Sequence, residues 1–522
     1  TLFSNNLLSL VVFWELVSLC SYVLISFWND DELCLRAAAK CLIMTHIGTM
    51  ALLAVAIIIF FSTGTLEILQ IGKGISLGYP LISIVFLLML VAILPKTVLF
   101  PLHTWLPDGT IAPTSATVIF HVCGFQSGVY IIVRFFYQVF HFHVLSAPPI
   151  PLAPLFGNVS LWNFVASFIG AITLIIGGLN GLIENDLKRI VAYGTISGLG
   201  CIVMVVSLNA PLCIAAGLFL MLSHAFCFGA LFLCSGAIIH ATGRHDINEM
   251  DRLYHRMPIT SACCLIGVLS MLTVPLFSEF ASKYLVIHST IYAGATFSTV
   301  IALFGCILNV AVGMRLLHSF FVQTKDVTTF SGQIKDPPAL MLLPMIIMSA
   351  ASVIFGIFPA VPLSFLIIPA VKQMGFTVEI TSQLAIIETP LGFWSPMIVA
   401  TAMLALSAVF ILMILHFRKG AVAGRNVERE ETFQPFLCGE GSNLLDGPHG
   451  YHFYHTLTHV LRVEQLCKAS NVDRAYNALS AKFLDLCAKL LRLDIRQGYF
   501  GAILSFVAGA VVALALSMVF GG

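Results

Sequence analysis

Long apolar runs separated by short charged connections dominate the chain. A helix needs about 20 apolar residues to cross a bilayer, and runs of this length recur along most of the sequence. Backbone groups in hydrocarbon must bond internally, and the pattern lacks the alternating short strands of a membrane barrel. We therefore predict an all-α polytopic membrane protein with about twelve spans. Their expected bounds are 2–28, 36–62, 81–106, 113–142, 160–183, 190–208, 211–241, 258–289, 292–322, 338–359, 393–417 and 499–520.

Residues 418–498 interrupt this pattern with a long, charged stretch. Inside it, apolar residues recur at helical spacing with charged residues mostly between them, and Ser470 with Asp473 makes a plausible capping box. The apolar positions are Val472, Ala475, Leu479, Phe483, Leu486, Leu490 and Leu493. We predict a lateral amphipathic helix over 472–493 on the membrane surface, followed by a terminal anchor helix in 499–522.

Composition agrees with a membrane protein and excludes several other classes. Hydrophobic residues make up 59% of the chain and charged residues 10%, whereas a soluble domain carries about 25% charged residues. The net charge of +1 provides no basic field for nucleic acid. Most of the 14 cysteines fall in apolar runs without zinc or iron–sulfur spacing, so we expect no metal and no cofactor. The chain begins without Met or a charged leader, and it reads as starting in the middle of a longer pattern.

The distribution of Lys and Arg predicts the orientation. Positive residues concentrate in loops on the cytoplasmic side of a membrane protein. The loops from odd to even spans contain Arg36, Lys188, Arg189, Arg244, Arg252, Arg256, Lys325 and Lys335, whereas the other loops contain Lys73 and Lys372. We therefore expect the odd-to-even loops and segment 418–498 in the cytoplasm, with residue 1 outside.

Two predicted spans combine prolines with charged residues at membrane depth. Pro95 and Pro101 bracket Lys96, and Pro275 precedes Lys283. Proline breaks helices, and broken helices in matching places of two halves are the best pointer to the ion site of a transporter. Because five spans separate one break from the other, we expect two five-helix repeats in inverted topology.

Charged groups within spans are the candidates for ion transport. Burying a lysine costs about 2.5–3.5 kcal/mol, and a desolvated ammonium gives up its proton more easily. The alternative is a lysine that snorkels to the interface, which fits Lys283 better than Lys96. Glu15 lies in the middle of its span, and we expect it to pair with Lys96; the alternative is a neutral carboxyl that hydrogen-bonds to another helix.

Three histidines also lie inside predicted spans. His46, His121 and His224 suit a proton relay because histidine titrates near neutral pH. Each could equally serve as an interhelical hydrogen-bond donor. Lys40 lies near the start of its span and fits a snorkelling lysine and a relay residue equally well. Glu279 lies one helical turn before Lys283.

Five sequence stretches resemble the antiporter-like subunits shared by respiratory complex I, energy-converting membrane-bound hydrogenases, formate hydrogenlyases and Mrp-type Na⁺/H⁺ antiporters. They are LPKTVLFPLHTWLPDGTIAPTSA, ENDLKRIVAYGTIS, LSHAFCFGALFLCSGAIIHATG, DINEMDRL and PLFSEFASK, within about residues 1–320. The resemblance implies fourteen core helices in two inverted repeats, of which about four N-terminal helices are missing here. It implies a truncated first repeat in 1–142, a second repeat in 160–322 and peripheral helices in 338–417.

The resemblance also implies roles for single residues. Glu15 matches the fifth-helix glutamate of the family, Lys96 the lysine of the first broken helix, His224 the eleventh-helix histidine and Lys283 the exit-side lysine. Two positions depart, because Gln126 and Phe228 stand where several relatives have lysine, so the relay must run through histidines and water or be impaired. The expected relay comprises Glu15, Lys96, His121, His224 and Lys283, with Lys40, His46, Gln126 and Glu279 as secondary candidates.

The expected function is translocation of protons or Na⁺ by one subunit of a redox-driven complex, such as an energy-converting hydrogenase or a complex I-like NADH/quinone oxidoreductase. Its partners would be other membrane subunits, including a redox module, in the inner (plasma) membrane of a prokaryote. One alternative is a component of a multi-subunit Mrp antiporter; another is a membrane scaffold that does not pump. The predicted lateral helix favours a subunit of a redox-driven complex over both alternatives, because the helix would reach along a neighbouring subunit. The segment ETFQPFLCGEGS also resembles the hydrogenase branch of the family.

Overall fold

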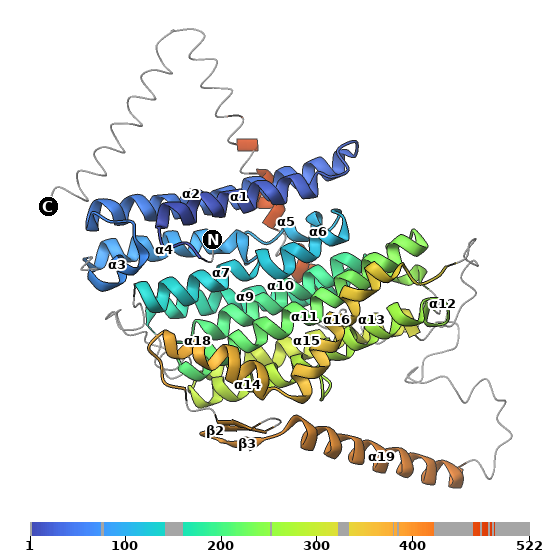
Figure 1. Ribbon diagram of the computed structural model, residues 1–522. Coiled ribbons are helices and arrows are strands. Elements are labelled where there is room, and N and C mark those ends of the chain that lie inside the picture. The colour runs from blue at the N-terminus through green and yellow to red at the C-terminus, as the bar shows by residue number, and fades with distance from the viewer. Residues whose placement is uncertain are drawn as a thin grey trace.

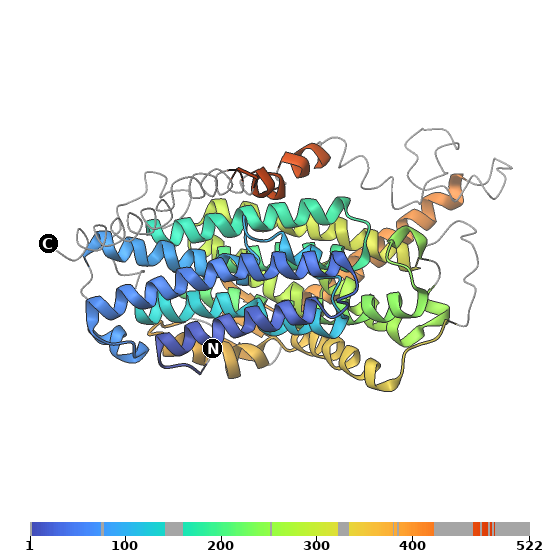
Figure 2. The same ribbon diagram turned by 90° about the horizontal axis from the view of Figure 1, so that it is seen from above.

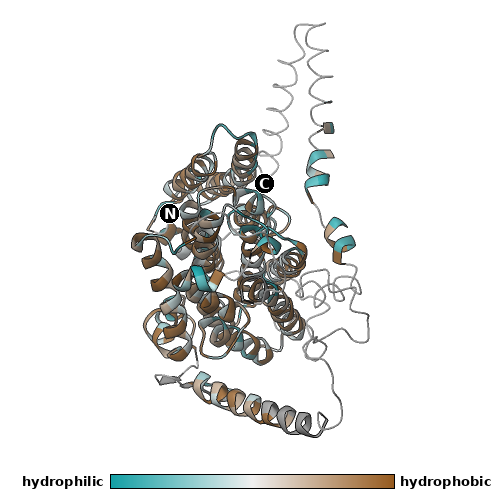
Figure 3. Cartoon of the chain, turned by 90° about the vertical axis from the view of Figure 1, so that its right-hand side faces the viewer, coloured by the Kyte–Doolittle hydropathy of each residue, from teal (hydrophilic) through white to brown (hydrophobic). Residues whose placement is uncertain are grey.

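The long helices run side by side in one elongated bundle, as Figures 1 and 2 show. This computed structural model describes residues 3–74, 78–140, 160–250, 253–321, 334–378, 381–383, 386–421, 463–469, 472–478, 481–482 and 485. The two N-terminal helices form one edge of the bundle, and α19 lies at the opposite edge (Figure 1). Most of the bundle's helices consist of hydrophobic residues, as the colouring of Figure 3 shows.

The helices of the first 140 residues surround one break. They are α1 (Leu7–Ile25), α2 (Glu32–Thr63), α3 (Ile68–Gly74), α4 (Tyr79–Lys96), α5 (Trp105–Gly109), α6 (Thr114–Ile119), the π-helical turn η1 (Phe120–Gly124), α7 (Gln126–Ile131) and the π-helical η2 (Ile132–Val139).

The next group surrounds the second break. It consists of α9 (Leu161–Ile183), α10 (Leu187–Val206), α11 (Pro211–Thr242), the short η3 (Ile247–Glu249), α12 (Leu253–Arg256), α13 (Pro258–Met271), α14 (Ser278–Tyr292) and α15 (Thr296–Phe321).

The remaining elements lie at the edge of the bundle. They are α16 (Ala339–Ile357), α17 (Ala360–Pro362), η4 (Leu363–Ile367), α18 (Ile368–Gln373), the strands β1 (Thr381–Gln383), β2 (Ile386–Thr389) and β3 (Gly392–Trp394), then α19 (Pro396–Ala421) and α21 (Val463–Ala469). Residues 472–478 are also helical.

Eight helices in the described residues are long and apolar enough to cross a membrane, and four shorter helices are apolar. The helical membrane fold therefore follows the sequence prediction. Two features depart from it. An antiparallel sheet of order β1-β2-β3 follows α18, and an apolar helical stretch over Ala360–Gln373 was not predicted. Strands of three or four residues are too short to show a clear alternation. The predicted anchor over 499–520 lies outside the described residues.

Helix α10 forms the centre of the bundle and packs against α9 at backbone distance. A Cβ added at Gly170 would lie 2.5 Å from the Met204 nitrogen, and one at Gly200 would lie 2.4 Å from the Leu174 nitrogen. Small residues at helix interfaces permit this approach in membranes, where van der Waals packing drives helix association. The close contact fixes α10, which supplies side chains to the site described below.

The first helix break follows Lys96, where the prolines predict it. Helix α4 ends at Lys96, Val98 adopts a left-handed φ of 56°, and the chain becomes helical again at Trp105. The Trp105 indole donates to the Pro95 carbonyl at 2.9 Å, so one carbonyl near the break is satisfied. Lys96 is therefore the last helical residue before an irregular stretch in the interior of the bundle.

The second break separates α13 from α14. Thr273 and Leu276 both have positive φ, 57° and 81°, on either side of Pro275. The Ser352 hydroxyl of α16 lies 3.1 Å from the Ser270 hydroxyl and 3.1 Å from the Ser278 hydroxyl. It therefore ties together the two helix ends on either side of the break.

The described C-terminal turns lie beside the first break, along the flank of the bundle (Figure 2). The Asp473 carboxylate accepts from Lys40 at 2.9 Å and from the Thr104 hydroxyl at 2.7 Å. The Tyr476 hydroxyl donates to the Pro101 carbonyl at 2.9 Å. This part of the predicted lateral helix thus contacts its own chain, and its contact with a neighbouring subunit stays a prediction. Most of 479–493 lies outside the described residues.

The positive loops expected in the cytoplasm meet at one end of the bundle. The amide of Ile247 donates to the Asn185 carbonyl at 3.0 Å, which joins the loop before α10 to the loop after α11.

We predict that a cysteine replacing the exposed Asn248 will react with a membrane-impermeant maleimide only in inside-out vesicles, because the Lys/Arg excess predicts that this end faces the cytoplasm. A cysteine at Tyr292, at the far end of α14, is the matched control and should react only in intact cells. Labelling of position 248 from outside would reverse the topology.

Candidate functional site

Lys96 is buried near one edge of the bundle with a partner that was not predicted. Its side chain is 4% exposed. The ammonium donates to the Ser18 hydroxyl of α1 at 2.8 Å and lies 5.7 Å from the centroid of the Trp14 ring. A hydroxyl oxygen and an aromatic face both stabilise a cation without neutralising it. Lys96 is thus held by neutral groups in this conformation.

Glu15 is directed toward a different residue. Its carboxylate lies 2.9 Å from Nδ1 of His46 on α2, and both side chains are partly exposed. The described structure contains no ion pair between Glu15 and Lys96, although the sequence predicts one in at least one state. Because Glu15 and Ser18 are three residues apart on one helix face, the two possible partners of Lys96 are neighbours.

Lys40 binds acidic groups rather than the buried relay. Its ammonium lies 2.7 Å from Asp108 and 2.9 Å from Asp473. Asp108 also lies 3.7 Å from Arg189 at the start of α10. These residues border a cavity of about 500 Å³ that includes Lys40, Asp108 and Arg189. The cluster therefore joins α2, the first break, α10 and the C-terminal turns.

Four further candidates lie next to one another in a buried row. His121 Nε2 lies 3.3 Å from the His224 carbonyl, and the two rings are 5.1 Å apart. His224 Nδ1 lies 3.3 Å from Glu279 Oε1, and Glu279 Oε2 lies 2.9 Å from the Lys283 ammonium. Burial makes this row unusual, because each of the four residues is at most 6% exposed. Buried charges are stable only when paired, and Glu279 pairs with both neighbours.

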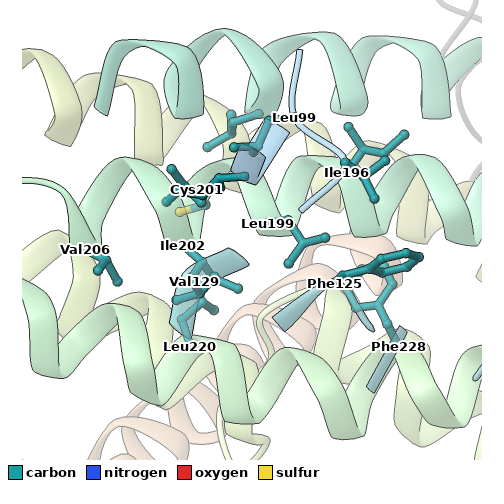
Figure 4. Packing of buried hydrophobic residues seen from close by; sticks show 14 of the residues in the cluster. Leu99, Phe125, Val129, Ile196, Leu199, Cys201, Ile202, Val206, Leu220 and Phe228 are labelled. Atoms are coloured by element: carbon teal, nitrogen blue, oxygen red, sulfur yellow. The ribbon is translucent and has the colours of Figure 1, made fainter. Parts of the chain in front are cut away.

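Aromatic rings enclose the two histidines. Phe125, Phe228 and Phe232 lie within 6.2 Å of the His121 ring, and Phe228 is 4.2 Å from the His224 ring. Figure 4 shows Phe125 and Phe228 in the same apolar layer. The phenylalanine that replaces the expected lysine therefore fills space against His224. Any proton that enters this pair must pass through an apolar surround.

Gly198 on α10 makes room for His224. A Cβ at position 198 would lie 2.2 Å from His224 Cε1, and Phe228 packs on the same ring. The ring orientation that brings Nδ1 to Glu279 thus depends on the absence of a side chain at this position. This requirement has no signal in a single sequence, because a glycine in an apolar helix is common in membrane proteins.

The link between Lys96 and His121 is incomplete in the described residues. Gln126 lies one turn beyond His121, and both of its amide atoms are buried without a hydrogen-bond partner among the described residues. The structure therefore brings together His121, His224, Glu279 and Lys283, and separately Glu15 with His46 and Lys96 with Ser18. The described residues contain no cluster of three His, Cys, Asp or Glu side chains that could hold a metal ion.

Sequence reasoning missed Ser18, Thr195 and Gly198, and ranked Glu279 as secondary. The Thr195 hydroxyl lies 3.4 Å from His121 Nδ1. Ser18 could have been found, because it lies one turn after Glu15 on the same face. Glu279 could also have been ranked higher, because it lies one turn before Lys283 and helical neighbours at this spacing form ion pairs.

Comparisons with known proteins identify relatives among cation/proton antiporter components. The chain is 30% identical over 366 residues to a probable K⁺/H⁺ antiporter component of Rhizobium meliloti, covering 68% of this chain and 35% of the relative. It is 28% identical over 453 residues to a Na⁺/H⁺ antiporter component of Alkalihalophilus pseudofirmus, covering 80% and 53%. The chain thus spans about half, or less, of the length of these curated relatives.

Solved structures share the fold at low identity. The membrane-bound sulfane sulfur reductase, an archaeal respiratory membrane complex, contains a chain that matches with a TM-score of 0.77 at 22% identity, covering 98% of this chain and 81% of that one. A chain of the Mrp complex from Dietzia matches with a TM-score of 0.61 at 19% identity, covering 71% and 73%.

The family assignment rests on a separate match. Residues 4–309 match the family model described as "NADH:quinone oxidoreductase/Mrp antiporter, TM". This stretch includes both helix breaks and every residue of the candidate relay. The chain therefore belongs to the NADH:quinone oxidoreductase/Mrp antiporter transmembrane family.

Proposed function

We propose that this chain is an antiporter-like subunit that carries protons, or Na⁺ in exchange for them, through a multi-subunit membrane complex. The buried row from His121 to Lys283 is the observation that carries the proposal, because four titratable side chains in sequence have little structural use inside a bilayer. The lateral segment would contact a neighbouring subunit, and the end with the positive loops would face the prokaryotic cytoplasm.

The two breaks support the proposal of two inverted repeats, one within 1–142 and one within 160–322. A lysine lies close to each break in the sequence: Lys96 is the last residue of α4, and Lys283 lies in the second turn of α14. We propose that residues 338–417 are peripheral membrane helices, that 418–498 lie in the cytoplasm and that 499–522 anchor the end of the chain. Together they would give about twelve crossings.

The second histidine can pass a proton from one ring nitrogen to the other. His224 Nδ1 faces Glu279, while Nε2 is buried without a hydrogen-bond partner among the described residues. A proton would arrive at Nε2 and the Nδ1 proton would leave for the Glu279 carboxylate. The neutral carboxyl then no longer holds the Lys283 ammonium by charge, so the ion pair loosens at the moment when the proton reaches it.

The first histidine has a hydroxyl partner that fits both of its charge states. His121 Nε2 must donate to the His224 carbonyl, because a carbonyl only accepts. In neutral His121, Nδ1 can accept from Thr195; in the protonated ring, Nδ1 donates and the Thr195 hydroxyl can turn to the Val191 carbonyl at 3.0 Å. Thr195 thus permits protonation without leaving a donor unsatisfied.

Two kinds of driving force are compatible with this path. A redox-driven complex is supported by the fold match to a respiratory complex over 98% of the chain. Cation exchange without a redox partner is supported by relatives named as Na⁺/H⁺ or K⁺/H⁺ antiporter subunits. Inside-out vesicles with the complete complex separate the two: Na⁺ or K⁺ pulses alone drive proton movement in the second case only.

We call the part of the relay around Glu15 and Lys96 the entry half and the part from His121 to Lys283 the exit half. Lys96 is the buried cation of the entry half, so we predict that Lys96→Ala abolishes coupled proton movement and leaves any electron transfer of the complex partly active. The ratio of protons moved to electrons transferred is measured by recording the quenching of a pH-sensitive dye together with the oxidation of the electron donor. Lys372→Ala, at an exposed lysine, is the control and should match wild type. A normal ratio of protons to electrons in Lys96→Ala would favour a scaffold that does not pump.

We predict that Gly198→Ala lowers proton movement at least about tenfold without removing a titratable group, because small misplacements of reacting groups are costly. The added methyl would push the His224 ring away from Glu279. Gly124→Ala is the matched control, because its added Cβ meets only Phe120 Cβ, at 4.0 Å. Wild-type proton movement in Gly198→Ala, at equal amounts of assembled complex, would argue against the relay through His224.

A further inference from the structure

Lys283 borders a small cavity that the relay described so far does not use. The cavity has a volume of about 10 Å³, and its lining includes Ser197 and Cys201 of α10, Lys283 of α14, and Cys306 and Asn309 of α15. This volume is about the space that one water needs. Lys283 therefore lies between Glu279 on one side and, on the other, this largely apolar cavity with a few polar groups.

Asn309 is the polar group of α15 in this cavity. Its side chain is 6% exposed, and its Oδ1 atom is buried without a hydrogen-bond partner among the described residues. A buried carbonyl oxygen without a donor is costly. Because Asn309 and Lys283 line the same cavity, this oxygen is an acceptor within the surroundings of the Lys283 ammonium.

The depth of Asn309 in the bundle matches that of the Lys283 ammonium. Helices α14 and α15 meet where the Thr299 hydroxyl donates to the Thr290 hydroxyl at 3.0 Å. At 1.5 Å per residue, Asn309 lies about 15 Å inward from Thr299, and Glu279 lies about 16 Å inward from Thr290. The ammonium is at the level of Glu279, since the two form an ion pair at 2.9 Å.

We propose that Asn309 is a positioning residue that receives the Lys283 ammonium after it leaves Glu279, and that the cavity is where the relay discharges its proton. This inference rests on the proposed function. Once Glu279 has accepted the proton from His224, the ammonium turns and donates to Asn309 Oδ1. An N–H bond of the ammonium then breaks, its electron pair stays on nitrogen, and the proton passes to a water. The neutral amine takes the proton from Glu279, which restores the ion pair.

The face of α15 beyond Asn309 leads from the cavity toward the far end of the bundle. Ala302 and Gly305 share this face at helical spacing and line the cavity. Ser298, one turn further, is fully buried, and its hydroxyl has no hydrogen-bond partner among the described residues. Leu174 packs against Gly305 in this conformation. Water would therefore follow this face toward the end opposite the positive loops only when Leu174 moves aside.

The test uses inside-out vesicles that contain the complete complex, with proton movement recorded by dye quenching across a pH series. Asn309→Leu keeps the size of the side chain and removes the acceptor, so we expect proton movement to fall about tenfold. Asn309→Asp keeps an acceptor and adds a charge that holds the ammonium. We therefore expect activity to be retained, with its pH optimum raised by about one unit.

Two further variants keep the outcomes distinct. Ile307→Ala changes an exposed position of α15 outside the cavity and should behave as wild type. Lys283→Ala should abolish proton movement if the proposed function holds. A wild-type rate and pH profile in Asn309→Leu, together with loss of movement in Lys283→Ala, would overturn the role of Asn309 alone. Retained movement in Lys283→Ala would overturn the proposed function itself.

Discussion

The ion pair between Glu279 and Lys283 imposes the strongest constraint on this structure. Its two charges are 2.9 Å apart, and both side chains are buried inside the bundle. In such surroundings, a charge that loses its partner is strongly destabilising, so the neighbouring groups must respond whenever one partner changes protonation. The second break starts α14 directly before Glu279, and His224 reaches the carboxylate from α11. The ion pair thus couples the broken helix to the interior of the bundle.

The two halves of the relay differ in whether their lysine forms an ion pair with their glutamate. In the entry half, the charged groups are separated, with Lys96 on Ser18 and Glu15 on His46. In the exit half, Glu279 holds Lys283 directly. Between the two halves lies Gln126, whose buried amide atoms have no hydrogen-bond partner among the described residues. Phenylalanines surround the histidines.

Much of this could be predicted from the sequence, for physical reasons. Apolar length fixes membrane helices, and Pro95 and Pro275 mark the breaks because proline removes a backbone donor. Charges in apolar runs are rare, so Lys96, Glu279 and Lys283 stand out. The partners of these charges were harder to predict. Lys96 contacts Ser18, and Glu15 contacts His46, through tertiary contacts that a single sequence does not show. Gly198 is important only because the His224 ring lies against it. The short sheet after α18 lacks a periodic signal.

The protonation state of Glu279 during turnover is the most direct test of this account. Infrared difference spectroscopy of the working complex can detect the carbonyl stretch of a protonated carboxyl, and Glu279→Gln identifies the band. The account predicts a band that appears during turnover, shifts in heavy water and is missing in Glu279→Gln. A carboxylate that stays ionised throughout, while the complex still moves protons, would contradict a relay through His224, Glu279 and Lys283.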